Sequence, residues 1–382
     1  MRICYTLLSP TFGMHQYTAD LANRMAQAGH DVHVVTSSHA PLDRYIATVT
    51  VHTPVDTTGT GFSLHGLKLD GLRKAEKAIL EVDSDLIHFT GPHVWNLLLM
   101  RKSRARGLPV IHTLHQMDPP LGSRYGPLFR LWNWKVIRTA DHLLVHAQAY
   151  QQRLLDMGVP RERVTSTPML HLFIGGSWLG ISPDLAVSIE YQPWALFFGD
   201  LRQDKGVEYL LSACAMMETD KSFPGRVVVA GSGDLDKFWG GSLPTRLEIH
   251  NRRINDEEAM DLFSRCGLLV LPYVDASQSA LIAAAYYFRK PVIVTRSGAL
   301  PEYVREDVTG FVVEPDHPAA LARCLERVLD DPVKLQRMGS AGRAWYEVHR
   351  MEQEAALTGV YTRLARAKAA TLPGPQPAVN AG

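Results

Sequence analysis

Short runs of apolar residues alternate with stretches of helical periodicity along most of the chain. The run from Ile3 to Leu8 is followed by helical spacing from Tyr17 to Ala28, and then by a second run from Asp31 to Thr36. Strands that alternate with helices in this way are typical of right-handed crossovers in a parallel sheet. The pattern predicts further strands in the first half of the chain at Leu86–Phe89, Val110–Leu114, His142–Val145 and Val164–Thr167.

The periodicity weakens across Phe173–Pro193, a stretch rich in Gly, Ser and Pro, and resumes beyond it. We therefore expect a first domain at 1–175 and a second at 176–349, with a helix at about 350–366 that packs back on the first. The tail at 370–382 is rich in Pro, Gly and Ala and is expected to be disordered. The predicted fold class is α/β, with two doubly wound, Rossmann-like parallel-sheet domains that face each other across a ligand-binding cleft.

Length and composition narrow the function classes. The chain has 382 residues, of which 46% are apolar and 21% charged, and its net charge of +1 provides no field that favours nucleic acid. The four cysteines are scattered in apolar segments, which favours reduced thiols of a cytosolic protein over a disulfide framework or a zinc site. The sequence contains no signal-peptide pattern and no apolar run long enough to span a bilayer, so we expect a cytoplasmic location.

Two cations, Arg202 and Lys205, lie in a short loop between a strand that ends at Gly199 and a helix that Gly206 opens. An arginine offers a bidentate fork and a lysine a point charge, and both groups bind phosphate oxygens. The loop is therefore a candidate diphosphate site. A solvated loop with two ordinary surface cations is the alternative.

A second candidate anion site is the Ser277-Gln278-Ser279 cluster, which opens a helix with no charged residue before Arg289. Backbone N–H groups at the start of a helix have no intrahelical partner and carry partial positive charge, so they are suited to an anion in the same cleft. The apolar body from Ala280 to Phe288 is expected to pack against the sheet. A capped, buried helix without a ligand is the alternative.

Glycine and histidine positions add weaker candidates. Gly13 lies between the first strand and the first helix, where a glycine lets a ligand approach the backbone or simply permits a positive φ. His112 and His115 are three positions apart on a strand and so face opposite sides of it. We therefore expect no metal site there.

Taken in order, these segments resemble the family 4 glycosyltransferases, which are retaining enzymes of the GT-B fold, over nearly the whole chain. The resemblance implies transfer of a sugar, with retention of configuration, from a nucleoside diphosphate sugar to a hydroxyl acceptor that is a glycan, a lipid-linked compound or a small molecule. It implies neither a metal nor another cofactor. The segments that carry it are Gly13, Ala28–Thr36, Val110–His115, Gly199–Gly206, Asn251–Tyr273 and Lys290–Pro315.

The resemblance also implies roles for single residues. Lys205 matches a lysine that neutralises the departing diphosphate, and Arg202 stands two positions after the usual arginine position, which Asp200 occupies here. His115 matches a histidine that faces the donor sugar, followed here by Gln116 where an aspartate is frequent. The implied site comprises catalytic His115, Arg202 and Lys205, and donor-binding Gly13, Arg253, Ile254, Ser277, Gln278, Ser279 and Ala280, with Arg253 and Ile254 beside the base.

The chain departs from the family at its E-x7-E motif, which falls on Ala276 and Ala284. It resembles a variant branch that lacks both glutamates and carries Ser-Gln-Ser, whose neutral hydrogen-bonding groups are partial substitutes. Glu302, the next acid downstream, is interpreted as structural. Two alternatives stay open: a non-catalytic protein that binds a nucleotide sugar, and a sugar-nucleotide epimerase on the same fold.

The first domain is expected to hold the acceptor. Residues 1–171 hold 18 Lys and Arg against 13 Asp and Glu, and the run Arg130–Arg138 combines tryptophans with cations. One interpretation is contact with the inner face of a membrane or with an anionic, lipid-linked acceptor. The favoured interpretation is an ordinary amphipathic helix with Trp132 on its buried face.

Overall fold

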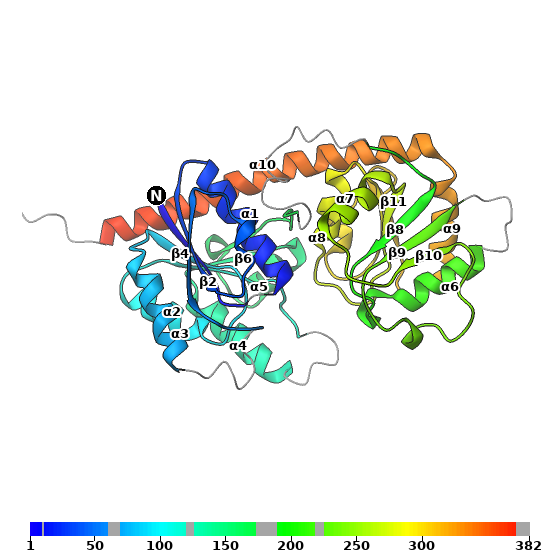
Figure 1. The fold of residues 1–382 in the computed structure, drawn as a ribbon. Helices are drawn as coiled ribbons and strands as arrows, with labels where there is room; N and C mark the ends of the chain where they lie inside the picture. Colours follow the sequence, from blue (N-terminus) through cyan, green and yellow to red (C-terminus); the bar gives the residue numbers. More distant parts are fainter. Residues whose placement is uncertain (10, 60–68, 120–125, 173–188, 218–224, 372–382) are drawn as a thin grey trace, which may run out of the picture.

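The computed structural model describes residues 1–9, 11–59, 69–119, 126–172, 189–217 and 225–371. They form two α/β domains that lie side by side, with one long helix running along both (Figure 1). The domain boundary predicted between residues 175 and 176 and nearly all of the predicted tail lie outside the described residues. Among the described residues, no helix is long and apolar enough to cross a membrane.

The N-terminal domain is built on a parallel sheet with the strand order β3-β2-β1-β4-β5-β6-β7. Its central strands are buried on both faces, which explains why they are continuous apolar runs in the sequence. The strands are β1 (Arg2–Leu7), β2 (Asp31–Ser37), β3 (Val49–Val55), β4 (Leu86–Phe89), β5 (Val110–Thr113), β6 (His142–Val145) and β7 (Val164–Ser166). The helices are α1 (Phe12–Gln27), α2 (Leu69–Glu81), α3 (Asn96–Ala105), α4 (Gly126–Thr139) and α5 (Gln148–Asp156).

The C-terminal domain repeats this design with a parallel sheet in the order β10-β9-β8-β11-β12-β13. Its strands are β8 (Trp194–Phe198), β9 (Arg226–Ala230), β10 (Leu247–His250), β11 (Leu268–Leu271), β12 (Val292–Thr295) and β13 (Gly310–Val313). Its helices are α6 (Val207–Met217), α7 (Asp256–Arg265), α8 (Ala280–Tyr287), α9 (Pro318–Leu329) and α10 (Pro332–Thr371), with the short 3-10 helices η4 (Gln203–Lys205) and η6 (Leu300–Tyr303) beside the cleft. The predicted α/β class with two parallel sheets is confirmed.

The last helix, α10, crosses from the second domain to the first (Figure 1). Its first half packs on α8, and its second half reaches the core of the N-terminal domain. There the Tyr361 hydroxyl lies 2.7 Å from His88 Nδ1 and 3.2 Å from the Tyr5 hydroxyl. Arg350 forms a buried ion pair with Asp20 of α1. This helix therefore ties the two domains together by contacts that are shielded from water.

Two neighbouring residues of η6 connect the domains beside the cleft. The Glu302 carboxylate accepts hydrogen bonds from the backbone N–H groups of Gln148 (2.6 Å) and Ala149 (3.0 Å). These N–H groups are at the start of α5, where they have no acceptor within the helix. The buried Tyr303 hydroxyl donates to the His146 carbonyl oxygen (2.7 Å) and accepts from the Met169 N–H (2.8 Å). Glu302 thus serves as an N-cap supplied by the other domain.

Each sheet has one point where the chain order reverses, between β1 and β4 and between β8 and β11. In open parallel sheets, ligands bind at such points, outside the carboxyl ends of the strands. The segments that follow β1, β8 and β11 are therefore the places where a site is expected.

Candidate active site

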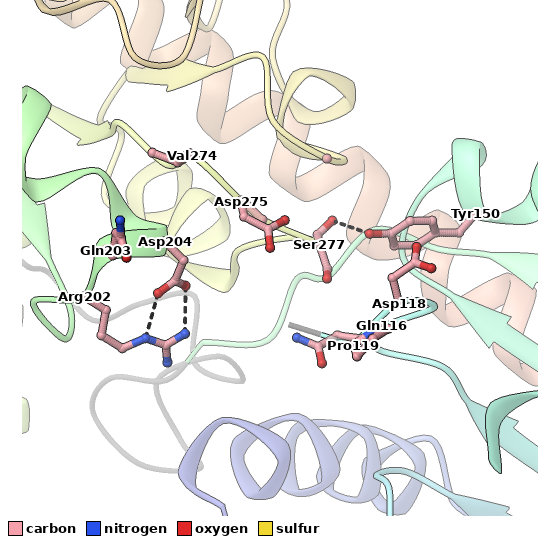
Figure 2. A pocket seen from close by; sticks show the side chains of 12 residues that line it. Gln116, Asp118, Pro119, Tyr150, Arg202, Gln203, Asp204, Val274, Asp275 and Ser277 are labelled. Carbon is pink, nitrogen blue, oxygen red and sulfur yellow. Dashed lines mark hydrogen bonds and ion pairs between the residues drawn. The ribbon is translucent and has the colours of Figure 1, made fainter. Parts of the chain in front are cut away.

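Two cavities open between the domains at the carboxyl ends of the strands. The larger, of about 1030 Å³, lies against the turns after β8, β9 and β10, and residues of the first domain near the start of α1 close it from the other side. The smaller, of about 540 Å³, lies against the turns after β8 and β11 and faces residues 116–119 of the first domain (Figure 2). Arg202 belongs to the lining of both cavities, so they adjoin at this side chain.

Glycine turns bring the backbone close to the larger cavity. At Gly231 (φ 153°), a Cβ atom would lie 1.9 Å from the carbonyl oxygen of Gly199, so only glycine fits. Of the residues predicted to bind the donor, Gly13, Arg253 and Ile254 all line this cavity. Opposite them, Arg44 of the first domain is 2.7 Å from Asp256 of the second, an ion pair that spans the cleft.

Arg202 forms a fork with Asp204 between the two cavities. Its Nε donates to Oδ1 at 2.8 Å and its Nη2 to Oδ2 at 2.7 Å (Figure 2). A guanidinium has five N–H donors, so this pair holds the group in one orientation and leaves donors for a ligand. The Arg202 side chain is 56% exposed, which makes those donors accessible from the cleft.

Lys205, the second predicted cation, lies behind this fork. Its ammonium is 3.8 Å from the ring centroid of Tyr273 and 3.9 Å from Asp204 Oδ2. It lines neither of the two cavities. The helix that follows begins beside Gly206 (φ 64°), where a Cβ atom would lie 1.9 Å from the Pro272 carbonyl oxygen. The loop therefore packs directly on the turn after β11, and Lys205 adds positive charge from beneath the cavity wall.

The segment Ser277–Ser279 opens α8 as the sequence predicts. Ser279 is the N-cap, and its hydroxyl accepts a hydrogen bond from the Leu281 N–H at 3.3 Å. Ser277 lines the smaller cavity, and its carbonyl oxygen accepts a hydrogen bond from the Tyr150 hydroxyl across the domains at 3.5 Å. Gln278, Ser279 and Ala280 line neither cavity. Ser277 is thus the member of this segment whose side chain the structure places at the site.

The two alanines of the altered motif have different surroundings. Ala276 lines the smaller cavity, whereas Ala284 is fully buried in the core of the second domain. A carboxylate at position 284 would require a buried partner to be stable. The alanine at position 284, in place of an acid, therefore fits the tight apolar packing around this helix.

Besides Asp204, the smaller cavity is lined by two carboxylates and a tyrosine that the sequence did not predict. Asp118 is forked by Arg153, whose Nη2 lies 2.9 Å from Oδ1, and this hydrogen bond lowers the pKa of Asp118. Asp275 lies in the turn after β11 and lines the cavity beside Ser277 (Figure 2). In the sequence it immediately precedes Ala276, the first alanine of the altered motif. That adjacency is the signal by which the sequence indicates it as a candidate. Tyr150, on α5, completes the wall.

His115 lies beside the cleft, not in the lining of the two cavities. Its Nε2 is 2.8 Å from the Thr90 carbonyl oxygen and so carries the proton, which leaves Nδ1 as a buried acceptor without a partner among the described residues. Burial lowers the pKa of His115 to about 4. The imidazole is therefore neutral at physiological pH, and the Tyr17 and His146 rings pack on it at 4.9 and 5.0 Å.

The described part of the chain contains no group of three or more His, Cys, Asp or Glu side chains placed to hold a metal ion. The groups gathered at the two cavities are instead hydrogen-bond donors and acceptors, one forked guanidinium and glycine backbone. Such a set suits a ligand with phosphate oxygens at its centre and hydroxyl groups at its ends.

Comparison with known proteins agrees with this assignment. Residues 13–168 match the family model described as Glycosyltransferase Family 4, and residues 192–331 match Glycosyl transferases group 1. The chain belongs to glycosyltransferase family 4, and it is a glycosyltransferase, as the sequence predicted.

Its curated relatives include several D-inositol 3-phosphate glycosyltransferases. The protein of Thermobifida fusca is 26% identical over 376 residues, covering 86% of this chain and 83% of that protein. The protein of Streptomyces griseus subsp. griseus is 32% identical over 180 residues, which are 44% of this chain and 38% of that protein.

Solved structures share the whole fold. Sucrose-phosphate synthase from Thermosynechococcus elongatus superposes with a TM-score of 0.70 at 17% identity, covering 95% of this chain and 100% of that one. Anabaena Alr3699/HepE in complex with UDP-glucose gives a TM-score of 0.66 at 17% identity, with 97% and 100% covered. The predicted GT-B arrangement of two facing Rossmann-like domains is confirmed.

Proposed function

We propose that the protein transfers a sugar from a nucleoside diphosphate sugar to a hydroxyl acceptor with retention of configuration. The observation that carries this proposal is the shared position of Arg202 between a larger and a smaller cavity. A nucleotide sugar has the same three-part plan, with a nucleoside and a sugar joined by an anionic diphosphate. The nucleoside then occupies the larger cavity beside Arg253 and Ile254, and the sugar occupies the smaller one.

The cations act on the leaving group. Cleavage of the bond between the anomeric carbon and the diphosphate oxygen places negative charge on the diphosphate, and preorganised donors stabilise it. Arg202 offers the N–H donors that Asp204 does not use, and Lys205 contributes charge from behind. The acceptor oxygen bonds to the anomeric carbon on the face that the diphosphate leaves, and the acceptor proton passes to a diphosphate oxygen.

Support for a UDP-linked donor comes from Alr3699/HepE, which has been crystallised with UDP-glucose. The direct test is a thermal-shift screen with UDP, GDP and ADP and their sugars, followed by product analysis. Transfer requires donor consumption that depends on an added acceptor. An epimerase would convert the donor sugar without an acceptor, and a non-catalytic binding protein would be stabilised by the donor without consuming it.

We further propose that the first domain contacts an anionic membrane surface through α4. On this helix, Leu128, Leu131 and Trp134 are exposed large apolar side chains spaced three residues apart, so they share one face. Trp132 faces the core, as expected for the amphipathic helix. The Arg138 guanidinium lies 4.1 Å from the Trp134 ring, and such mixed aromatic and basic faces favour anionic lipid interfaces.

Co-sedimentation with vesicles tests this contact. The wild-type protein is expected to bind vesicles of phosphatidylglycerol and phosphatidylcholine, and not phosphatidylcholine alone. The double variant Leu131→Gln/Trp134→Gln is expected to lose this binding while it keeps donor binding. Equal sedimentation of the wild type and the variant with anionic vesicles would contradict the contact and leave sugar transfer untouched.

A further inference from the structure

The loop after β11 is held in one conformation by contacts with the loop after β12. The Ser297 hydroxyl donates to the Val274 carbonyl oxygen and accepts from the Ala276 N–H, both at 3.1 Å. Gly298 has a φ of 49°, and a Cβ atom there would lie 1.5 Å from the Ala276 carbonyl oxygen. The residue between these anchors, Asp275, is therefore fixed in position by its neighbours and not by its own side chain.

A third anchor comes from the diphosphate loop. The Asp204 carbonyl oxygen accepts hydrogen bonds from the backbone N–H groups of Val274 at 3.0 Å and Asp275 at 3.3 Å. Asp275 thus has a fixed position relative to Arg202, whose fork closes on the side chain of the same Asp204. A group held at this point has a defined position relative to a bound diphosphate.

The carboxylates that line the smaller cavity differ in their partners. Asp118 is paired with Arg153, and Asp204 is paired with Arg202. Within the part of the chain that the structure describes, the Asp275 carboxylate has neither a hydrogen bond nor an ion pair, and Figure 2 shows it between Asp204 and Ser277. Because its acceptor oxygens are unused, it can bind hydroxyl groups of a ligand.

We infer that Asp275 orients the transferred sugar by accepting hydrogen bonds from its hydroxyl groups, and that it makes the enzyme select neutral or amino sugars over uronic acids. The inference rests on the proposed function, because it assigns the smaller cavity to the donor sugar. The side chains of Ala276 and Ala284 cannot form a hydrogen bond with a hydroxyl group, and Asp275 supplies a carboxylate at the turn that Ala276 occupies. A uronate carboxylate in this cavity would meet the unpaired charge of Asp275 and be repelled.

Binding measurements separate this role from the binding of the nucleotide. Isothermal titration of the full chain compares UDP, UDP-glucose and UDP-glucuronate, or GDP, GDP-mannose and GDP-mannuronate if the guanosine series stabilises the protein in the thermal-shift screen. The wild type is expected to bind the neutral sugar nucleotide at least about tenfold more tightly than the uronate. In Asp275→Asn, affinity for the nucleoside diphosphate is expected to stay within about twofold of wild type, whereas affinity for the neutral sugar nucleotide falls about tenfold.

The same variant is expected to reduce the preference for the neutral sugar over the uronate, because the repelling charge is gone. Asp275→Ala, which also removes the remaining acceptor, is expected to bind the neutral sugar nucleotide more weakly still. Asp261→Asn on α7 is a matched control, since its exposed carboxylate pairs only with Arg265 among the described residues. Its affinities are expected to equal those of the wild type.

The outcomes distinguish this inference from the proposed function. If the wild type binds no nucleoside diphosphate and no sugar nucleotide, the proposed function fails. If it binds them but Asp275→Asn and Asp275→Ala leave both the affinity for the neutral sugar nucleotide and the uronate discrimination unchanged, the role of Asp275 is wrong while the proposed function stands. Circular dichroism melts check that both variants are folded, which the absence of side-chain partners at Asp275 leads us to expect.

Discussion

Arg202 donates two hydrogen bonds to Asp204, two residues ahead of it in the same turn, and this fork stands between the two cavities of the cleft. The Arg202 side chain is more than half exposed and Asp204 is partly buried, so the contribution of the pair to stability is modest. Its role is geometric. It orients a guanidinium whose remaining donors face the space where a diphosphate would lie between a nucleoside and a sugar.

Arg202→Ala is therefore expected to lower kcat/KM by about 100-fold or more, because it removes charge-assisted donors to the leaving group. Arg202→Lys keeps the charge and loses the fork, so it should recover only part of the activity. Steady-state kinetics with the donor found by the thermal-shift screen measures both. Arg226→Ala is a matched control, since this exposed arginine pairs with Glu248 away from the two cavities. Full activity of Arg202→Ala would refute the role.

Lys205→Met tests charge that acts from behind the cavity wall. The ammonium lies over the Tyr273 ring and near Asp204, but outside the two cavity linings. We expect kcat to fall about tenfold or more while the melting temperature changes by only a few degrees, because a single cation–π contact that is not fully desolvated contributes about 1 kcal/mol. Lys237→Met, on an exposed lysine paired with Asp234, is the control. A large loss of stability with unchanged kcat per folded molecule would make Lys205 purely structural.

Two glycines at the cleft predict opposite results for the same substitution. In Gly206→Ala, the new Cβ would meet the Pro272 carbonyl oxygen in a left-handed backbone conformation, so we expect a loss of about 2 kcal/mol or more in the free energy of unfolding. In Gly13→Ala, no atom lies within 4 Å of the new Cβ, and the site is in the first turn of α1, so stability should be unchanged or slightly higher.

Urea denaturation and titration with the nucleoside diphosphate measure both effects. Gly13→Ala is expected to weaken nucleotide binding although it leaves the protein stable, because Gly13 lines the larger cavity. Unchanged affinity would show that Gly13 is not needed for close approach of the ligand. A stable Gly206→Ala would contradict the packing of the two loops.

The strand pattern was readable from the sequence where strands are buried on both faces. In the second domain, strands β8, β11 and β12 are short apolar runs, because both faces of the sheet are covered at its centre. Edge strand β3 was missed. Its burial alternates irregularly, and Thr50, Thr53 and Pro54 break the apolar run.

The site was predictable in part for a similar reason. Arg202, Arg253 and Ile254 lie in the turns that follow strand ends, and the carboxyl ends of strands in a parallel sheet share one edge. Asp118 and Tyr150 come from the facing domain, and their place at the cavity depends on how the two domains dock. The local sequence pattern carries no information about how the domains dock. Docking is set by contacts between segments far apart in the chain, such as those of Glu302 and α10.

Glu302→Gln tests the cap that one domain supplies to the other. The carboxylate accepts hydrogen bonds from two N–H groups at the start of α5, where negative charge is favourable, so its loss should lower the free energy of unfolding by about 1 kcal/mol.

Tyr303→Phe tests the second contact of η6. It leaves the buried Met169 N–H without its partner and should lower the free energy of unfolding by about 1–3 kcal/mol. Denaturation and small-angle scattering measure stability and domain separation. Glu306→Gln, in the turn beyond η6, is the local control, because an amide oxygen can still accept the hydrogen bond that Glu306 receives from the Val312 N–H. Wild-type behaviour of Glu302→Gln and Tyr303→Phe would remove η6 as a connection between the domains.

Stability is expected to fall steeply on acidification, because the first domain buries neutral histidines. Burial lowers the pKa of His93, His115, His142 and His171 to about 4, and that of His112 to about 3. In the unfolded chain these groups titrate near 6.5, so between pH 6.5 and 4 the unfolded state binds protons that the native state does not. The stability that these neutral histidines provide is then fully present above pH 6.5 and is lost as the pH falls, by up to about 1.4 kcal/mol per pH unit for each such histidine.

Urea denaturation between pH 7.5 and 5 is expected to show this loss. The slope of the unfolding free energy against pH should correspond to the uptake of several protons on unfolding. NMR titration of the imidazoles in the native protein provides the check, because native pKa values near 6.5 for these five histidines, or an unfolding free energy that stays constant down to pH 5, would contradict the prediction.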